Sequence, residues 1–233
     1  MLKEITLKDI YDFEYYLAEE RQNKSAARAR KTAALKSFFS YLYKRANLID
    51  TNPIVDIEMP SVKKALPKFL TLEESIRLLS SENFENPERD YCMLVLFLNC
   101  GMRLNELVSI NVGDIDFKEK RLLLKGKGNK QRMIYINDAC TEALRAYIRS
   151  RKNPPEEPDA LFLSRKKRRI SRRRVEQIVE KLLKQAGLGN RGISPHKLRH
   201  TAATLMYQHG NVDTLVIKEV LGHASIATTE IYT

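Results

Sequence analysis

The sequence predicts a mainly α-helical protein of two domains with one small antiparallel β-hairpin. Apolar residues recur near helical spacing along most of the chain. Two short strand-like runs, 121–125 and 131–136, flank a glycine-rich turn. A stretch with two prolines and several lysines interrupts the helical pattern. We therefore expect a helical first domain at 1–57, a linker at 58–69 and a larger second domain at 70–233.

Two helices are expected in the first domain. Thr6 is a suitable N-cap for a helix that runs to Glu20, and Ser25 for a longer helix that ends near Ala46. Their apolar faces are predicted to contain Ile10, Phe13, Tyr16, Leu17, Leu35, Phe38, Phe39 and Leu42. Two short helices enclose a small core, so further residues before the first helix are expected to complete this domain.

The second domain is expected to begin with two helices. Thr71 and Glu74 match a capping box, in which each side chain bonds the other residue's backbone N–H. Asn86 and Pro87 suit the N-cap and first turn of an apolar helix that ends at Gly101. The hairpin follows, and 114–117 is a candidate for a short third strand.

Helices and one loop complete the second domain. Asp138 is expected to begin a helix that runs to about Arg151, followed by a loop at 153–158. Ser171 is a suitable N-cap for a helix that reaches Ala186. The pair Ser194-Pro195 is expected to begin a helix that ends at Gly210.

The cysteines argue against a disulfide framework and against a zinc ribbon. There are three of them, Cys92, Cys100 and Cys140, with no CxxC spacing. Cys92 and Cys100 lie in an apolar run and are expected to be buried thiols. The run from 91 to 100 is too short to cross a bilayer. With no signal peptide apparent, we expect a cytoplasmic protein in a reducing bacterial or archaeal cell interior.

The charge indicates a polyanionic partner. Lys and Arg number 41 against 29 Asp and Glu, which leaves a net charge of +12. The densest basic run, 165–174, is predicted to be a phosphate-contacting loop and helix start, although a disordered basic tail is the alternative. The residues expected to contact a nucleic-acid backbone are Arg28, Arg30, Lys31, Lys36, Lys63, Lys64, Lys130, Arg132, Arg165, Lys166, Lys167, Arg168, Arg169, Arg172, Arg173 and Arg174. For Arg28, Arg30, Lys31 and Lys36 a solvated helix face is an equally good interpretation, and Lys130 and Arg132 are expected to add only background charge.

Arg103 and Glu106 form the first candidate pair for chemistry. Their i, i+3 spacing puts them on one helix face, where the carboxylate can orient the guanidinium. A solvated ion pair is the alternative. Because Arg103 follows Gly101 at a helix break, we expect it to be exposed in a cleft.

His196, Arg199 and His200 form the second candidate group. Their i, i+3 and i+4 spacing places them on one helix face. Two histidines at i, i+4 can bind zinc, but the interleaved cations and the absence of an obvious third ligand disfavour a metal. For His196 we favour phosphate contact. For His200 a hydrogen bond to backbone inside the fold is at least as well supported as a role in chemistry.

Lys127 and Tyr232 are weaker candidates when each is considered alone. Lys127 lies at the hairpin tip between two glycines, which would let the loop approach a ligand closely. Tyr232 is one of ten tyrosines and follows His223 by nine residues. Arginines, a lysine, histidines and a tyrosine together suit a phosphodiester that is attacked by a protein hydroxyl without a metal.

These motifs together resemble the tyrosine site-specific recombinases, the phage integrase family, and most closely its Xer branch. The stretches that carry the resemblance are 99–107, 125–130, 194–201 and 221–232, with Asn52-Pro53 and Leu66-Pro67 near the domain junction. The resemblance covers essentially the whole chain. It implies a two-domain DNA clamp, in which a helical core-binding (SAM-like) domain and a catalytic domain close around duplex DNA. It also implies a tail beyond the tyrosine that docks onto a neighbouring protomer.

The resemblance implies a catalytic set of Arg103, Lys127, His196, Arg199, His223 and the nucleophile Tyr232, supported by Glu106 and His200. The implied reaction forms a 3′-phosphotyrosyl bond and proceeds through a Holliday junction, without metal, ATP or other cofactor. Chromosome dimer resolution and mobile-element integration or excision are both compatible with it.

The implied partner is duplex DNA with a specific recombination site. A tetramer on two such sites is expected for the full-length protein. A sister recombinase or an accessory protein is a further candidate partner, and no membrane partner is expected. A type IB topoisomerase-like relaxase and a non-catalytic DNA-binding regulator are the alternative functions.

Overall fold

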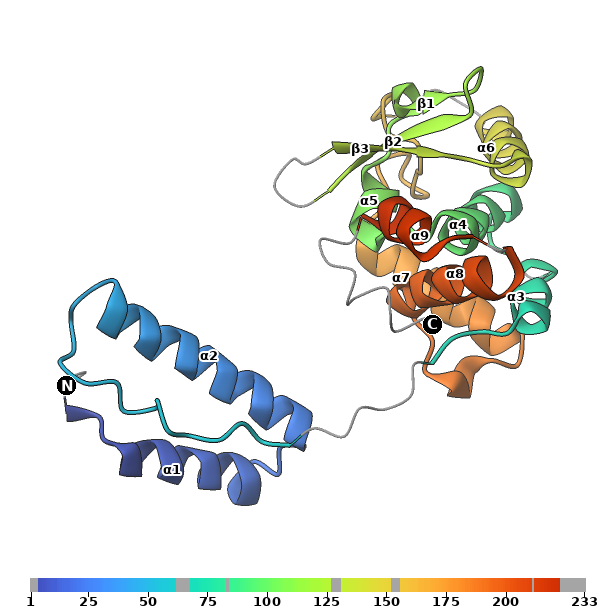
Figure 1. Ribbon diagram of the computed structural model, residues 1–233. Coiled ribbons are helices and arrows are strands. Elements are labelled where there is room, and N and C mark those ends of the chain that lie inside the picture. The colour runs from blue at the N-terminus through green and yellow to red at the C-terminus, as the bar shows by residue number, and fades with distance from the viewer. Residues whose placement is uncertain are drawn as a thin grey trace. The chain divides into compact units, whose positions relative to one another are not determined.

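The computed structural model describes residues 4–61, 68–82, 84–126, 131–151, 156–210 and 212–222. The chain divides into two compact units, Met1–Leu66 and Pro67–Thr233 (Figure 1). No helix in the described part of the chain is long and apolar enough to cross a membrane.

The first unit is built on two helices. Helix α1 spans Leu7–Tyr15 and continues as one π-helical stretch, Tyr16–Glu20. Helix α2 spans Ser25–Lys44. The predicted capping role of Thr6 is confirmed, since its hydroxyl accepts from the Asp9 N–H while the Asp9 carboxylate accepts from the Thr6 N–H. The small core of this unit consists of Ile10, Phe39, Leu42, Ile49, Ile54 and Ile57.

Two expectations for this unit are corrected. Ser25 is the first residue of α2 and not its cap, because the N-cap position belongs to Lys24, which makes no side-chain cap hydrogen bond. The predicted apolar faces are buried in part: Leu17 joins Ile10 in the interior, but Phe13, Tyr16 and Phe38 keep at least a third of their surface exposed. The core of two helices is too narrow to cover every apolar side chain that the helical periodicity selects.

The core of the second unit surrounds helix α4, Pro87–Cys100, which is buried from Cys92 to Leu98. It packs against α6, Asp138–Ser150, and α8, Pro195–Gly210 (Figure 1). Asn86 caps α4 as predicted, its side chain accepting from the Arg89 N–H. The apolar run at 91–100 is therefore a core helix, as expected, and all three cysteines are buried free thiols.

The predicted hairpin is confirmed and extended by the predicted third strand. Strands β1, Ile115–Asp116, β2, Arg121–Lys125, and β3, Gln131–Tyr135, form one antiparallel sheet in that order. Leu122 pairs with Ile134 and Leu124 with Arg132. Residues directly opposite each other in antiparallel strands share a face. This register therefore places an arginine on the same face as three buried aliphatic side chains.

Four further helices complete the second unit. They are α3, Leu72–Leu79, α5, Leu104–Ser109, α7, Arg172–Gln185, and α9, Thr214–Leu221. The predicted caps at Thr71 and Ser171 are present, each accepting from the N–H three residues later. Short 3₁₀ turns occupy Val112–Asp114 and Gly189–Arg191. The predicted loop at 153–158 lies partly outside the described residues.

Candidate functional site

A glycine elbow at the end of α4 sets the geometry of the site. Gly101 has φ +55°, in the left-handed region that favours glycine. A Cβ added there would lie 2.5 Å from Cδ2 of Leu221, the last residue of α9. The glycine is therefore needed both to turn the chain toward α5 and to let α9 approach the end of α4.

Arg103 follows this elbow and precedes the first turn of α5. The sequence placed Arg103 and Glu106 on one helix face; Arg103 is instead the N-cap residue, in extended conformation. Their expected pairing is present: Arg103 donates from Nη1 to Glu106 Oε1 at 3.0 Å and from its backbone N–H to Oε2 at 2.7 Å. Its Nη2 donates to the Gly222 carbonyl at 3.3 Å. The Arg103 side chain is 47% exposed, so part of its guanidinium remains open to a ligand.

Glu106 is bound by a second arginine that sequence reasoning treated as background charge. Arg132 donates from Nη1 to Oε1 at 2.5 Å and from Nη2 to Oε2 at 3.0 Å. The Glu106 side chain is 1% exposed. Burial raises its pKa, but the hydrogen bonds and charge of Arg132 and the hydrogen bonds from Arg103 outweigh burial and lower the pKa below its ordinary value. Glu106 is therefore a buried, ionised carboxylate shared by two guanidinium groups.

Arg199, on α8, joins the ends of two helices. Its Nη1 donates to the Gly101 carbonyl at 2.7 Å and its Nη2 to the Leu221 carbonyl at 2.6 Å. The residue is buried. Carbonyls at helix C-termini carry partial negative charge and lack intrahelical donors, so a buried cation stabilises both ends at once. Arg199 thus holds the elbow and the end of α9 together.

His196 and His200, one turn apart on α8, lie against each other. Their Nε2 atoms are 3.2 Å apart and their rings are in edge-to-face contact. Burial, helped by the neighbouring charges of His196, Lys197 and Arg199, lowers the pKa of His200 to about 4. Burial and nearby cations also lower the pKa of His196. At neutral pH both rings are therefore neutral, and one donates to the other.

One pocket brings three of the predicted residues together. A cavity of about 270 Å³ is lined by Arg103, His196 and Arg199, and by Asn105, Glu176 and Ser194 among others. Guanidinium and imidazole groups on its wall suit a bound oxyanion. The clustering expected for Arg103, His196 and Arg199 is therefore present.

Some of the predicted site residues lie outside the described residues, namely Lys63, Lys64, Lys127, Lys130, His223 and Tyr232. In the sequence, Lys127 and Lys130 lie between β2 and β3, and Lys63 and Lys64 lie just before the end of the first unit. His223 and Tyr232 follow Gly222, whose carbonyl accepts from Arg103. The described chain thus ends at the pocket, one residue before His223.

The basic run 165–174 is largely engaged by the protein itself. Arg165 and Arg174 both pair with Glu85, and Arg168 pairs with Glu156. Arg169 donates to the carbonyls of Val108 and Ile110 and to the Asn111 side chain. These bonds fix a loop against the end of α5, and they do not support a role for Arg169 in DNA contact.

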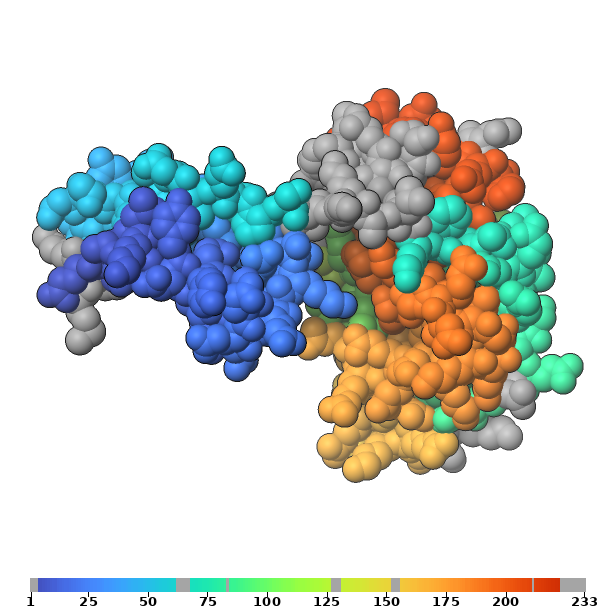
Figure 2. All heavy atoms as spheres, turned by 90° about the horizontal axis from the view of Figure 1, so that it is seen from below, coloured from blue at the N-terminus to red at the C-terminus, as the bar shows by residue number. Residues whose placement is uncertain are grey.

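The remaining cations of this run are exposed, namely Lys166, Lys167, Arg172 and Arg173. Figure 2 shows the stretch that contains them, in light orange, gathered on one face of the second unit. Arg172 donates to Asn105, which also lines the pocket, at 3.3 Å. The start of α7 therefore adjoins the pocket.

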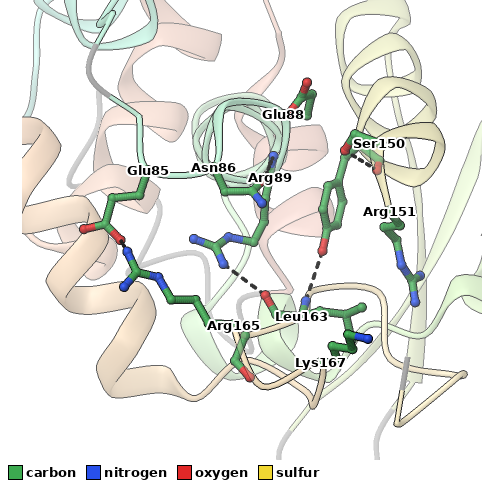
Figure 3. Close-up of a pocket in the computed structure, with 11 residues that line it drawn as sticks. Glu85, Asn86, Glu88, Arg89, Ser150, Arg151, Leu163, Arg165 and Lys167 are labelled. Carbon is green, nitrogen blue, oxygen red and sulfur yellow. Dashed lines mark hydrogen bonds and ion pairs between the residues drawn. The ribbon is translucent and has the colours of Figure 1, made fainter. Parts of the chain in front are cut away.

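A second cavity, of about 400 Å³, lies at the opposite end of α4 (Figure 3). Its wall includes Glu85, Arg89 and Arg165. Arg89 donates to the Leu163 carbonyl at 3.0 Å, and the Leu163 N–H donates to the Tyr147 hydroxyl at 3.0 Å. Helix α4 has 14 residues, which separates the two cavities by roughly 20 Å.

Among the residues that the structure describes, no group of three or more His, Cys, Asp or Glu side chains is placed to hold a metal ion.

Comparisons with known proteins agree with these motifs. The model of the phage integrase family matches residues 68–233. Tyrosine recombinase XerC of Caldanaerobacter subterraneus is 47% identical, over 100% of this chain and 66% of that protein. Tyrosine recombinase XerC of Thermodesulfovibrio yellowstonii is 40% identical, over 88% of this chain and 70% of that protein. The chain thus spans about two thirds of the length of these relatives.

Solved structures give the same result for the fold. XerH site-specific recombinase bound to a palindromic difH substrate, in a post-cleavage complex, superposes with a TM-score of 0.81 at 27% identity, over 100% of this chain and 69% of that one. XerA recombinase gives a TM-score of 0.66 at 29% identity, over 99% of this chain and 79% of that one. The mainly helical fold with a small antiparallel sheet is confirmed, and neither topoisomerase-like relaxation nor a non-catalytic regulator is favoured. The chain belongs to the phage integrase family and, within it, resembles the Xer tyrosine recombinases.

Proposed function

We propose that this chain is a site-specific DNA recombinase that uses Tyr232 to break and rejoin duplex DNA. The observation that carries the proposal is the pocket at the end of α4, where Arg103, His196 and Arg199 meet. The end of α9 is bound to the same arginines through the carbonyls of Leu221 and Gly222. Since Tyr232 follows Gly222 by ten residues, the nucleophile would enter from this edge of the pocket.

The first step is cleavage of one strand. The Tyr232 oxygen forms a bond to the scissile phosphorus while the bond to the 5′-oxygen breaks, leaving a 3′-phosphotyrosyl ester and a 5′-hydroxyl. Arg103 and Arg199 offset the charge that develops on the non-bridging oxygens, and His223 adds a hydrogen bond. Glu106 keeps Arg103 in the required orientation.

Two proton transfers accompany this step. The phenolic proton of Tyr232 passes to His196, whose lowered pKa keeps its ring neutral and able to accept at neutral pH. Lys127 donates a proton to the departing 5′-oxygen. Attack by the 5′-hydroxyl of a partner strand then reverses the chemistry and exchanges strands through a Holliday junction.

The proposed substrate is duplex DNA that carries a specific recombination site. The XerH relative is bound to such a duplex in its solved complexes. The exposed cations at the start of α7 would contact phosphates beside the pocket, and neutralised phosphates make binding strongly salt-dependent. We further propose that the whole protein assembles as a tetramer on two sites, with copies of itself or a sister recombinase.

Covalent trapping tests the proposal. The target duplex is first selected from a random library by binding, and is then nicked so that cleavage becomes irreversible. In EDTA, wild-type protein is expected to give a band of protein joined to DNA that survives denaturation. Tyr232→Phe should bind the same duplex and give none, whereas Tyr207→Phe, which alters a partly exposed tyrosine of α8, should react like wild type.

Two outcomes would contradict the proposal. Tight binding without any adduct in wild-type protein would leave a DNA-binding protein only. Adduct formation followed by relaxation of supercoiled DNA, without exchange between two labelled sites, would identify a relaxase.

A further inference from the structure

The buried face of strand β3 contains an arginine. Alternation along 131–135 places Arg132 on the same side as Ile134, which is 3% exposed. Across the sheet Arg132 is opposite Leu124, which is fully buried. Met133 and Tyr135 are exposed instead. A guanidinium on the core side of a strand is costly unless its charge and N–H groups are paired.

Arg132 is paired with the carboxylate that orients Arg103. Glu106 receives four hydrogen bonds: two from the guanidinium of Arg132, one from the guanidinium of Arg103 and one from the Arg103 N–H. A carboxylate has about four acceptor sites, so these donors saturate it. With Arg132 in place, Glu106 cannot rotate without breaking a bidentate pair.

Arg132 also lies against the end of α9. A Cβ added to Gly222 would lie 3.2 Å from Cδ, Nε and Cζ of Arg132. The carbonyl of the same glycine accepts from Arg103. The buried Arg132 Nε has no hydrogen-bond partner among the described residues. The Arg132 guanidinium therefore binds Glu106, which in turn binds Arg103 beside the glycine elbow. The same side chain lies next to Gly222, at the C-terminal end of α9.

We infer that Arg132 is a positioning residue for strand cleavage. By binding Glu106, Arg132 keeps the Arg103 guanidinium oriented toward the pocket, and its side chain also packs against Gly222. This inference rests on the proposed function. It replaces the sequence-based expectation that Arg132 adds background charge for DNA contact. Arg132 acts through other residues and does not touch the phosphate.

A double-mutant cycle tests the inference. In Arg132→Met, Glu106 retains a single guanidinium partner, and Arg103 is drawn toward the carboxylate and away from the phosphate. A misplacement of about 1 Å at a reacting centre costs on the order of 10²-fold in rate. We expect adduct formation at saturating nicked DNA to slow by that order, with the DNA dissociation constant unchanged within about twofold. In a Glu106→Gln background, Arg132→Met should reduce the rate of adduct formation little further, because the carboxylate through which Arg132 acts on Arg103 is already absent.

Two other variants keep the test informative. Arg132→Lys retains the positive charge but cannot form the bidentate pair with Glu106. This variant should fold like wild type but recover only part of the rate of adduct formation. Arg121→Met, which alters a partly exposed arginine of β2 paired with Glu119, should match wild type in rate. If Arg132→Met does not fold, the comparison of Arg132→Lys with Arg121→Met decides the question.

Each alternative has a distinct outcome. Weaker binding with a reduced salt slope would assign Arg132 to phosphate contact. A lower melting temperature with an unchanged rate per folded molecule would make it a structural ion pair; either result overturns the inference. Absence of adduct from wild-type protein overturns the proposed function itself, whereas a wild-type rate in Arg132→Met and Arg132→Lys overturns only the inference.

Discussion

The two ends of α4 each hold an arginine bound to a carboxylate, in opposite states of exposure. At the N-terminal end, Arg89 donates to Asp90 and to the Leu163 carbonyl, and the two side chains are 5% and 1% exposed. At the C-terminal end, Glu106 is equally buried but Arg103 is 47% exposed. Both partners of the arginine–carboxylate pair are buried at the N-terminal end, whereas at the C-terminal end the arginine is half exposed.

The difference shows what makes an arginine available to a ligand. Arg89 directs its donors to one carboxylate and one carbonyl inside the unit. At the other end a second arginine, Arg132, supplies part of the charge that Glu106 needs. Arg103 therefore keeps a fixed orientation while part of its guanidinium faces the pocket. An oriented but incompletely paired cation suits binding of an anion.

Arg89→Ala should have the largest effect, and on stability alone. Removing Arg89 leaves the buried Asp90 side chain without its cationic partner, and a loss of this kind costs about 3–5 kcal/mol. Chemical denaturation of wild type and variant measures this loss. Arg121→Ala, at a partly exposed arginine, is the control and should change stability by less than about 1 kcal/mol. If Arg89→Ala changed the free energy of unfolding equally little, the buried Arg89–Asp90 pair would contribute little to stability, and the two ends of α4 would not differ as stated.

Arg103→Ala should act on the chemistry instead. Loss of a donor to the developing charge lowers the cleavage rate by about 10²–10³-fold. Stability should change by less than about 1 kcal/mol, because Arg103 itself is half exposed and Arg132 still neutralises the buried Glu106. Single-turnover adduct formation and denaturant unfolding are measured on the same preparation. An unfolded variant, or a folded one with a normal rate, would contradict the assigned difference between the two ends.

The smallest effect concerns pH at the open end. The pKa of His200 is lowered to about 4 by burial and neighbouring cations, against 6.5 for an unperturbed ring. The unfolded chain binds this proton more readily, so the stability from the neutral ring is complete above pH 6.5 and is lost as pH falls toward 4. Unfolding free energies between pH 7 and 4 should thus fall less steeply in His200→Gln than in wild type. His209→Gln, at the exposed end of α8, should follow wild type, and an identical slope for His200→Gln would exclude this coupling.

Much of the fold follows from local sequence signals. The caps at Thr6, Thr71, Asn86 and Ser171 were predicted correctly because each hydroxyl or amide bonds an N–H a few residues away. The hairpin followed from alternation and a glycine-rich turn. Ser25 was assigned wrongly because a hydroxyl before an apolar pattern satisfies the capping rule equally well one residue inside the helix.

The sequence predicts which residues form the site but not the hydrogen bonds and ion pairs that join them. Motif spacing selected Arg103, His196 and Arg199, which the fold brings to one pocket. No local signal pairs Arg132 with Glu106, 26 residues earlier, or directs Arg199 to two helix ends. A period-two analysis of 131–135 would have placed Arg132 on the buried face, and that is the signal overlooked. In the basic run, charge density does not reveal which cations already pair with the protein's own acceptors.

Helix α9 is joined to its surroundings differently from every helix of the main core. Its apolar contacts form a separate small cluster of Ala203, Ile217 and Leu221, and arginines hold its last carbonyls. An element with so little buried apolar surface opens at a lower free energy than the whole domain. We therefore expect α9 to open locally, so that its amides exchange with solvent deuterium faster than those of α4.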